Sequence, residues 1–362
     1  MNDIDELKQF VVAHAQAQAM PEERYRTVLD RIRHDDEGQP GSWAVEWSAA
    51  GAGLAAAGEH LEAARCFNMA RFPFVDGPAR QEALTNCVDS LGRWQEAYPQ
   101  VERLDIELPK GRIGCWASGM SRTSPKPLVI LMGGIVSIKE QWASVLPLFE
   151  RLGMAVVVTE MPGVGENSLL YERDSWEMLP AVLDAVADRA DVSRTYAACL
   201  SFSGHLALRW GAADDRLRGV VTIGAPVSDF FTDREWFGRL PRVTLDTLAH
   251  LTGVPVGSLP DLFHNWALDA ALLKSLDFPV YYTASKRDEI IPPGDIRQLR
   301  EYVRNLSLNE YDDVHGSPNH ANEIRLWVPN SLLRMSGARN PQRAVTGLLL
   351  GLLRLRGKLS RA

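Results

Sequence analysis

Three side chains far apart in this sequence could together turn a serine into a nucleophile. The first is Ser201, which follows the apolar run Thr195–Leu200 and precedes a helical pattern that begins at Phe202. This order is typical of a nucleophile elbow, a sharp strand-to-helix turn that lifts one side chain above a parallel sheet. The alternative is an ordinary helix with serine as its N-cap. A serine hydroxyl is a poor nucleophile near neutral pH, so it also needs a base and a carboxylate that orients the base.

The turn around Ser201 departs from the usual Gly-x-Ser-x-Gly pattern. Cys199 and Ser203 stand where glycines are common, and Gly204 follows. All three residues are small, so the strand and the helix can still pass close together. We expect Cys199 to be a buried stand-in for glycine, because a reactive thiolate needs a nearby cation or a helix N-terminus to lower its pKa.

The expected acid follows a later strand. Asp288 lies in the loop just after the apolar run Val280–Thr283, and Glu289 is the adjacent alternative. A loop past a strand end is where the acid of a Ser–Asp–His set belongs in a sheet of this kind. The other interpretation is a solvated, charged turn.

Two histidines compete for the role of base. Both follow the strand-like run Ser307–Tyr311, and they are His315 and His320. Ser317 followed by Pro318 predicts a helix start, with serine as N-cap and proline at the first helical position. His320 would then lie in the first helical turn, as a pocket or capping residue. His315 lies in the loop before it, and we expect it to be the base.

An acyl-transfer intermediate needs two backbone N–H donors that stabilise its oxyanion. One is expected from Phe202, directly after the serine. The other is expected from Gly134 or Ile135, in the glycine-containing loop after the apolar run Leu128–Met132. Because neither a GxGxxG nor a GxxxxGK[ST] motif is present, this loop does not indicate nucleotide binding.

The elements that must position these residues alternate along the chain. Amphipathic segments such as Ile138–Leu152 and Ser175–Ala190 separate short apolar runs. This pattern predicts the α/β class, with a mostly parallel central sheet and helices on both faces, whose functional residues collect at the carboxyl ends of the strands. The predicted strands are Leu104–Leu108, Gly114–Ser118, Leu128–Met132, Ala155–Thr159, Thr195–Leu200, Gly219–Ile223, Val280–Thr283 and Ser307–Tyr311.

The same pattern suggests three parts. Residues 1–105 read as a helical N-terminal domain, with apolar residues at helical spacing from Trp47 to Phe67. Residues 106–340 form the sheet-containing core. Residues 341–362 form an amphipathic helix or tail, whose leucines either pack on the protein, contact a second copy or lie on a membrane surface.

A strandless interval at about 225–275 predicts a helical lid over the strand ends. It carries the aromatic residues Phe230, Trp236 and Phe263. These side chains either pack the lid onto the core or line an apolar substrate pocket, and both can hold.

Composition bounds the function. The chain has 362 residues and a net charge of −7, which gives no reason to expect nucleic acid as a partner. Its four cysteines are far apart without metal-binding spacing, so we expect no metal and no cofactor. The N-terminus is acidic and lacks a signal peptide pattern, and the apolar runs are too short to span a bilayer. A cytoplasmic enzyme acting on a small molecule is therefore expected.

Four separated signatures agree in their order along the chain. They are Gly133–Glu140, Glu160–Glu166, the turn at Ser201, and Asp288 with His315. Over about residues 40–335 the chain resembles the α/β-hydrolase superfamily. More closely, it resembles the branch with a helical N-terminal domain, which holds fermentation–respiration switch proteins, 2,6-dihydroxypseudooxynicotine hydrolase and fungal polyketide chain-shortening hydrolases.

That resemblance implies a triad on Ser201, Asp288 and His315, with N-terminal helices that help to close the pocket. It also implies that a homodimer is common and that C–C bonds of β-diketone-like substrates are among the targets. The function expected is a serine hydrolase of an ester, thioester or activated C–C bond in a mostly apolar, polyketide-like or aromatic small molecule. Acyl transfer, cyclisation or elimination in the same pocket is the alternative, and a non-catalytic binding protein is the second alternative.

Overall fold

The computed structural model describes residues 2–337 and 341–359 of the chain. Residues 1, 338–340 and 360–362, and with them the last three positions of the predicted C-terminal segment, lie outside the described residues. The order of elements follows the alternation seen in the sequence, with helices first and then strands separated by helices.

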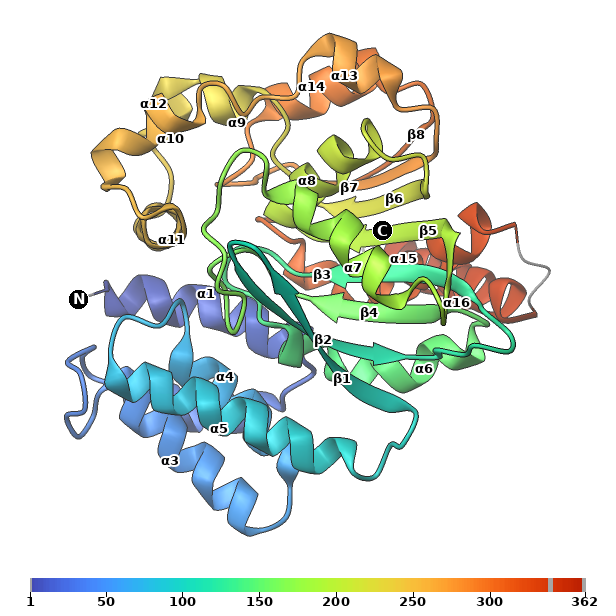
Figure 1. Cartoon of the computed structure of the whole chain (residues 1–362). Coiled ribbons are helices and arrows are strands. Elements are labelled where there is room, and N and C mark those ends of the chain that lie inside the picture. Colours follow the sequence, from blue (N-terminus) through green and yellow to red (C-terminus); the bar gives the residue numbers. More distant parts are fainter. Residues whose placement is uncertain (1, 338–340, 360–362) are drawn as a thin grey trace.

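Eight strands of the described chain form one mostly parallel sheet (Figure 1). The order across it is β1-β2-β4-β3-β5-β6-β7-β8, in which the β1–β2 and β2–β4 pairs are antiparallel and the other pairs parallel. Each strand lies where the sequence predicts one. The strands are β1 (Val101–Leu108), β2 (Gly111–Ser118), β3 (Pro127–Met132), β4 (Ala155–Thr159), β5 (Asp191–Cys199), β6 (Leu217–Ile223), β7 (Val280–Ser285) and β8 (Leu306–Tyr311).

Helices precede the sheet, cover it and follow it. Those before it are α1 (Ile4–Ala17), α2 (Glu22–Leu29), α3 (Trp43–Ala56), α4 (His60–Arg71) and α5 (Pro78–Gln95). Those between β3 and β6 are α6 (Leu146–Arg151), α7 (Met178–Val186) and α8 (Phe202–Gly211). The later ones are α9 (Asp229–Thr232), α10 (Arg234–Phe237), α11 (Arg242–Thr252), α12 (Leu259–Phe263), α13 (Ala270–Ser275), α14 (Pro293–Tyr302), α15 (Ala321–Met335) and α16 (Pro341–Leu359).

Two expected helices are interrupted by 3₁₀ turns. The segment Ile138–Leu152 contains the 3₁₀ helix η1 (Lys139–Val145) before α6, because Pro147 has no N–H to donate to the preceding turn. The segment Ser175–Ala190 begins with the 3₁₀ helix η2 (Ser175–Glu177), and α7 ends at Val186.

The N-terminal helices have a hydrophobic core of their own. Its largest members, Trp43 and Trp47, are fully buried with Leu7 and Val11 from α1. Helix α1 also contacts α11, in the helical interval between β6 and β7, because the Glu6 carboxylate accepts the N–H groups of Arg242 (2.8 Å) and Val243 (2.6 Å) at the start of α11. Figure 1 accordingly shows α1 between α4 and α11.

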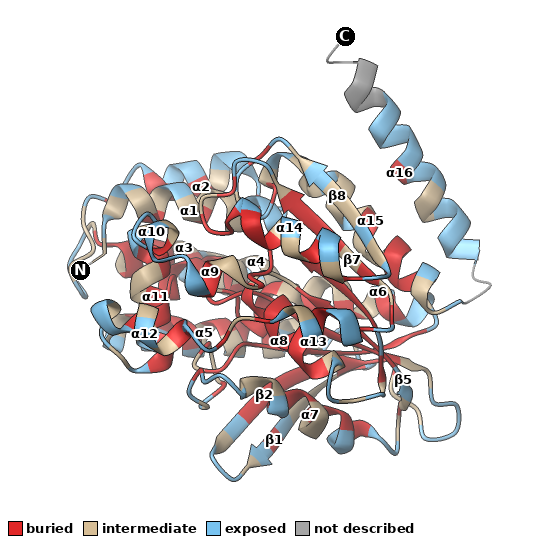
Figure 2. Ribbon diagram, turned by 90° about the horizontal axis from the view of Figure 1, so that it is seen from above, coloured by how far each residue is buried: buried red, intermediate tan, exposed pale blue. Residues whose placement is uncertain are grey.

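Burial is concentrated in the sheet and in the inner faces of the helices that cover it (Figure 2). Helix α16 differs from this pattern because it is rich in leucine but mostly exposed. Leu350 is buried, whereas Val345, Leu348 and Leu352 are at least half exposed. The helix packs on α15, where Asn330 donates to the Thr346 hydroxyl at 3.0 Å. Within residues 2–337 and 341–359, none of the helices has both the length and the apolar character of a membrane span.

Candidate active site

Ser201 lies at the sharp turn between β5 and α8. Its backbone has φ 57° and ψ −130°, a region that residues other than glycine rarely adopt. Its N–H donates to the Ile223 carbonyl at the end of β6 (2.8 Å), which holds the turn in this conformation. The sequence order of strand, serine and helix therefore forms a strained elbow, not an ordinary helix cap, and no N–H of α8 bonds to the Ser201 hydroxyl.

The close packing that the elbow requires is met by Gly204. A Cβ atom there would lie 2.1 Å from Thr222 Oγ1 and 2.7 Å from Ala225 Cβ, so α8 passes directly against β6 and the loop after it. The glycine at this contact lies one position later than the last glycine of the usual pattern.

The two unusual elbow residues are both buried. The Ser203 hydroxyl lies 3.0 Å from the Met132 carbonyl and 2.9 Å from the Leu200 carbonyl, so it joins the elbow to the end of β3. Cys199 is fully buried, as expected, and burial raises the pKa of its thiol to about 12. The thiol is therefore neutral near pH 7.

His315 joins the serine to a carboxylate. Ser201 Oγ lies 3.0 Å from His315 Nε2, and His315 Nδ1 lies 2.9 and 3.0 Å from the two Asp288 oxygens. An ionised carboxylate can only accept, so Nδ1 carries the proton and Nε2 is left to accept from the serine hydroxyl. Asp288 is held in turn by the N–H groups of Ile290 (2.9 Å) and Ile291 (2.8 Å).

The pKa of His315 reflects two opposing influences. Burial lowers the pKa of the imidazole, whereas the charge and hydrogen bond of Asp288 and the charge of Glu289 raise it. The net result is a pKa above the ordinary value of histidine. The ring must be neutral to accept the serine proton, so activity is expected only above this raised pKa.

Two further residues hold the histidine in place. Glu289, the alternative acid, accepts the backbone N–H of His315 at 3.0 Å instead of contacting its ring. Gly224, which the sequence did not single out, follows β6 with φ 60°, and a Cβ there would lie 2.8 Å from His315 Cε1. Its position directly after a predicted strand was the one signal available.

The expected oxyanion donors lie beside the serine. A Cβ on Gly134 would lie 3.0 Å from Ser201 Cβ and 3.3 Å from its Oγ, so this loop contacts the nucleophile. Phe202 is the first residue of α8, where backbone N–H groups have no intrahelical partner. Within the described chain no hydrogen bond uses the N–H of Phe202, Gly134 or Ile135, so each of these groups is available to an oxyanion.

The family of the chain follows from its similarity to known proteins. The profile of the esterase FrsA-like proteins matches residues 38–275. The chain belongs to the esterase FrsA-like family. Esterase FrsA of Vibrio cholerae is 27% identical over 250 residues, which cover 63% of this chain and 60% of that protein. The matched region thus spans about three fifths of the length of this curated relative.

Solved structures agree with this family. The structure described as AbyA5 wildtype is 50% identical, covers 97% of this chain and 100% of its own, and superimposes with a TM-score of 0.94. A 2,6-dihydroxy-pseudo-oxynicotine hydrolase shares the fold, with 20% identity, coverage of 89% and 95%, and a TM-score of 0.72. The fold and family of this FrsA-like chain are those of α/β-hydrolase enzymes, in the branch that the sequence resembles.

His320, the other histidine considered as the base, contacts Asp313 in this FrsA-like chain, whereas His315 contacts Ser201. His320 stacks on Tyr311 with ring centroids 4.2 Å apart, and its Nδ1 lies 3.0 Å from Asp313. As expected, Ser317 stands at the N-cap of a helical turn whose first residue is Pro318. However, Ser317 has φ 52°, and its hydroxyl lies 2.8 Å from the Ser285 hydroxyl and makes no capping bond. The turn is a short 3₁₀ helix, and α15 begins at Ala321.

Aromatic residues of the helical interval between β6 and β7 cluster against α8. Phe230 packs edge-to-face on Phe202 with centroids 5.1 Å apart, and Phe263 contacts Trp266 at 4.6 Å. Phe230 and Phe263 are fully buried in this cluster. Trp236 is only partly buried, and its indole N–H donates to the Ile290 carbonyl (2.8 Å), two residues after Asp288. Packing is thus established for all three, and substrate contact stays a prediction.

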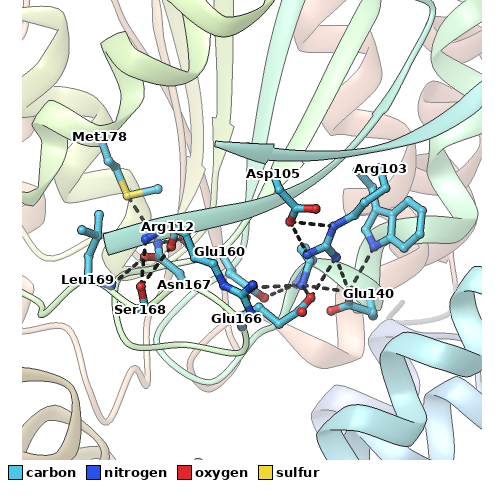
Figure 3. Close-up of polar contacts among 12 residues, drawn as sticks. Arg103, Asp105, Arg112, Glu140, Glu160, Glu166, Asn167, Ser168, Leu169 and Met178 are labelled. Carbon is cyan, nitrogen blue, oxygen red and sulfur yellow. Dashed lines mark hydrogen bonds and ion pairs between the residues drawn. The ribbon is translucent and has the colours of Figure 1, made fainter. Parts of the chain in front are cut away.

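The two family signatures meet in a buried ion network beside β2 (Figure 3). Lys139 and Glu140 come from the first signature, and Glu160 and Glu166 come from the second. Lys139 Nζ lies 2.9 Å from Glu140, 3.1 Å from Glu160 and 2.7 Å from Glu166. A Cβ on Gly165 would lie 2.3 Å from Glu160 Oε2, which accounts for one glycine of the signature.

This network fixes loops and is not part of the triad. Burial lowers the pKa of Lys139, but the three carboxylates outweigh it and raise that pKa overall. Glu160 also accepts the backbone N–H groups of Lys139 (3.0 Å) and Glu166 (2.8 Å), so it joins the loop after β3 to the loop after β4. Across the described ranges, no cluster of histidine, cysteine and acidic side chains is arranged to hold a metal ion.

Proposed function

We propose that the chain is a serine hydrolase whose nucleophile is Ser201, with His315 as base and Asp288 as the orienting acid. The observation that carries this proposal is the 3.0 Å contact between Ser201 Oγ and His315 Nε2, on a ring whose Nδ1 faces Asp288 at 2.9 Å. The strained backbone of Ser201 supports it, because such strain persists where it serves a function.

The reaction begins when Ser201 Oγ attacks the carbonyl carbon of the substrate. His315 Nε2 takes the hydroxyl proton, and Asp288 stabilises the imidazolium that forms. The carbonyl oxygen becomes an oxyanion that accepts from the N–H groups of Phe202 and Ile135. The intermediate collapses, the bond to the leaving group breaks, and Nε2 gives its proton to that group. Water then attacks the acyl-serine by the same steps and releases the acid.

The substrate class follows from the surroundings of the serine. In this proposal an aromatic lid, an N-terminal helical unit and the loop at Gly134 would enclose it, which would suit a mostly apolar, polyketide-like or aromatic small molecule with an ester, thioester or activated C–C bond. The N-terminal domain (residues 1–105) and the lid (225–275) would close this pocket through the contact between α1 and α11. His320 belongs to the outer wall in this proposal.

The proposal extends to the location of the protein in the cell and to its assembly. Four buried, unpaired cysteines are consistent with a reducing cytoplasm. The exposed leucines of α16 are consistent with a homodimer through this helix. Both proposals are checked on the intact protein, by fractionation of cells and by light scattering.

The experiment that tests the function is active-site labelling followed by turnover. A fluorophosphonate should label wild type on Ser201, and p-nitrophenyl esters should be hydrolysed. Ser201→Ala should remain folded, resist labelling and lose on the order of 10⁴-fold or more in kcat. Retention of more than about a tenth of wild-type activity would contradict the assignment.

The outcome of labelling also separates the other hypotheses. Labelling at Ser201 without ester turnover would favour acyl transfer, cyclisation or elimination in the same pocket. A folded wild type that the reagent fails to label would favour a binding protein on a hydrolase fold.

A further inference from the structure

Arg71, at the end of α4, is a buried cation whose hydrogen-bond acceptors among the described residues are all neutral oxygens. The residue is 2% exposed, and within the described residues no carboxylate forms an ion pair with it. Its guanidinium donates to Asn68 Oδ1 from Nε (3.0 Å) and Nη2 (2.7 Å), and to the Pro73 carbonyl (3.1 Å). Nη2 also donates to the backbone carbonyl of Val136, 65 residues further along the chain.

The Arg71 side chain is charged under ordinary conditions. Burial lowers the pKa of the guanidinium to about 10, against the raising influence of nearby groups that include Glu160 and Glu140. It is therefore still a cation at neutral pH. Burying a charge that forms no direct ion pair is costly, so the role of this guanidinium has to be sought in the neutral groups to which it donates.

The carbonyl that Arg71 holds belongs to the loop over Ser201. In that loop the N–H of Ser137 donates to the Gly134 carbonyl at 3.0 Å. Val136 C=O and Ser137 N–H are the two ends of one peptide unit, and Gly134 C=O and Ile135 N–H are the two ends of another. A continuous chain of hydrogen bonds thus runs from the guanidinium through two peptide units to the N–H of Ile135.

We propose that Arg71 is a positioning residue that strengthens the oxyanion hole through this relay. Rigid placement comes first, because the guanidinium fixes the Val136 carbonyl and with it the turn that aims the Ile135 N–H. Polarisation comes second, because each bond in a hydrogen-bonded chain strengthens the next, and here a full positive charge begins the chain. The inference rests on the proposed serine mechanism.

The location of Arg71 gives the N-terminal helices a part in catalysis. Val136 packs against the hydrophobic core of those helices. Asn68, whose Oδ1 holds Arg71, donates from its Nδ2 to the side chain of Gln18 after α1 (3.2 Å). The helices therefore act on the chemistry through the loop, besides covering the site.

The decisive experiment changes the charge and leaves the arginine in place. Asn68→Asp keeps an oxygen acceptor for the two guanidinium N–H groups that donate to Asn68 Oδ1. It also places a negative charge beside Arg71, which offsets the positive charge at the start of the relay. Loss of a whole oxyanion donor costs about 10²- to 10³-fold in kcat, so weakening one through a relay should cost roughly 3- to 10-fold. KM should stay unchanged, because the ground-state carbonyl carries little of the charge that develops in the transition state.

The chain offers a matched control for this variant. Asn330 on α15 is equally buried, and its Oδ1 accepts from Arg334 Nε at 3.0 Å. Asn330→Asp creates an ion pair with Arg334 away from the site, which does not change transition-state binding. It should therefore leave kcat within about twofold of wild type.

A second variant removes the relay altogether. Arg71→Met should lower kcat roughly 10-fold or more and weaken inhibition by a trifluoromethyl ketone by the factor lost in kcat/KM, because both depend on the oxyanion. Arg80→Met is its control, since Arg80 is also buried and binds the Phe72 carbonyl (3.1 Å) but pairs with Asp35 and Asp76. It should lower Tm without lowering kcat.

The outcomes separate this inference from the proposed function. Lower kcat at constant KM in Asn68→Asp supports the relay, whether or not Arg71→Met folds. Wild-type kcat in a folded Asn68→Asp protein overturns the relay, because the charge of Arg71 would then have only a structural role. Activity that survives Ser201→Ala would instead remove the serine mechanism itself.

Discussion

A side chain at position 224 would collide with the imidazole of His315. A Cβ on Gly224 would lie 2.8 Å from His315 Cε1 and 3.1 Å from Nδ1, and it would come within 3.6 Å of Asp288. The backbone after β6 is therefore the surface against which the histidine and its carboxylate are packed. Position 224 requires glycine for two reasons, the positive φ of 60° and the close approach of the His315 ring.

Gly224→Ala should displace His315 from Ser201 and lower kcat by roughly 100-fold, because small misplacements of reacting groups are costly. The matched control is Gly153→Ala, at a glycine with φ 73° and no atom within 4 Å of an added Cβ. Both variants carry the backbone strain of about 1–2 kcal/mol, and only the first should lose activity. Equal kcat in the two would show that the ring has room to move. Kinetics with a p-nitrophenyl ester, beside denaturant unfolding, would measure both effects.

Glu289→Gln should move the acid limb of the activity profile to lower pH. The glutamine side chain can still accept the His315 N–H, but the charge that helps to raise the pKa of His315 is gone. A lower pKa keeps the base neutral to a lower pH, so kcat/KM at about pH 6 should fall less than in wild type, while activity near pH 8 stays within about threefold. An unshifted limb would mean that Glu289 does not act on the ring.

Asp288→Asn gives the contrasting result. It removes the largest influence that raises the pKa of His315, and it also leaves Nδ1 without its carboxylate acceptor. In a comparable triad the same change costs about 10⁴-fold in kcat. If Asp288→Asn lost no more kcat than Glu289→Gln, Asp288 would not be the acid of the triad.

The arrangement of the site could be predicted in outline from the sequence. The strand–serine–helix order at Ser201 and the loops that carry Asp288 and His315 depend on local pattern and chain order, which a sequence records directly. Strands β2 to β7 could be predicted for the same reason, since buried strands leave continuous apolar runs, whereas the edge strands β1 and β8 are only partly buried. His315 was separable from His320 because a proline marks where the next turn begins.

Contacts between distant segments were beyond the sequence. Gly224 meets His315 across 91 positions, and Arg71 meets Val136 across 65, so no local pattern joins them. The signature residues Lys139 and Glu160 were visible as a motif, but their pairing in a buried network was not. The same limit applies to Ser317, whose hydroxyl is taken by Ser285 and not by a helix end.

Lys139→Met should destabilise the protein by about 3–5 kcal/mol, because it leaves the fully buried Glu160 carboxylate without its cation. Lys126→Met is the control, since Lys126 is paired with Glu150 at the surface (3.7 Å) and surface pairs contribute little. Urea unfolding of the three proteins would compare them. If Lys139→Met were as stable as the control, the network would be unimportant for the fold, whatever its effect on activity.

Acidification should destabilise the protein through His205 on α8. Burial first, and then the charge of Arg209, lower the pKa of this ring to about 3, and within the described chain its Nδ1 has no partner. The unfolded state therefore binds a proton below about pH 6.5 that the folded state does not, so stability falls as pH falls. Between pH 6.5 and pH 5 this group alone should lower the free energy of unfolding by roughly 2 kcal/mol.

His205→Gln, which can still donate to the Trp266 carbonyl, should lose that much less stability on acidification, whereas His264→Gln at an exposed position should behave as wild type. Urea unfolding at both pH values decides the matter, and equal acid sensitivity in all three proteins would show that His205 is protonated in the folded state.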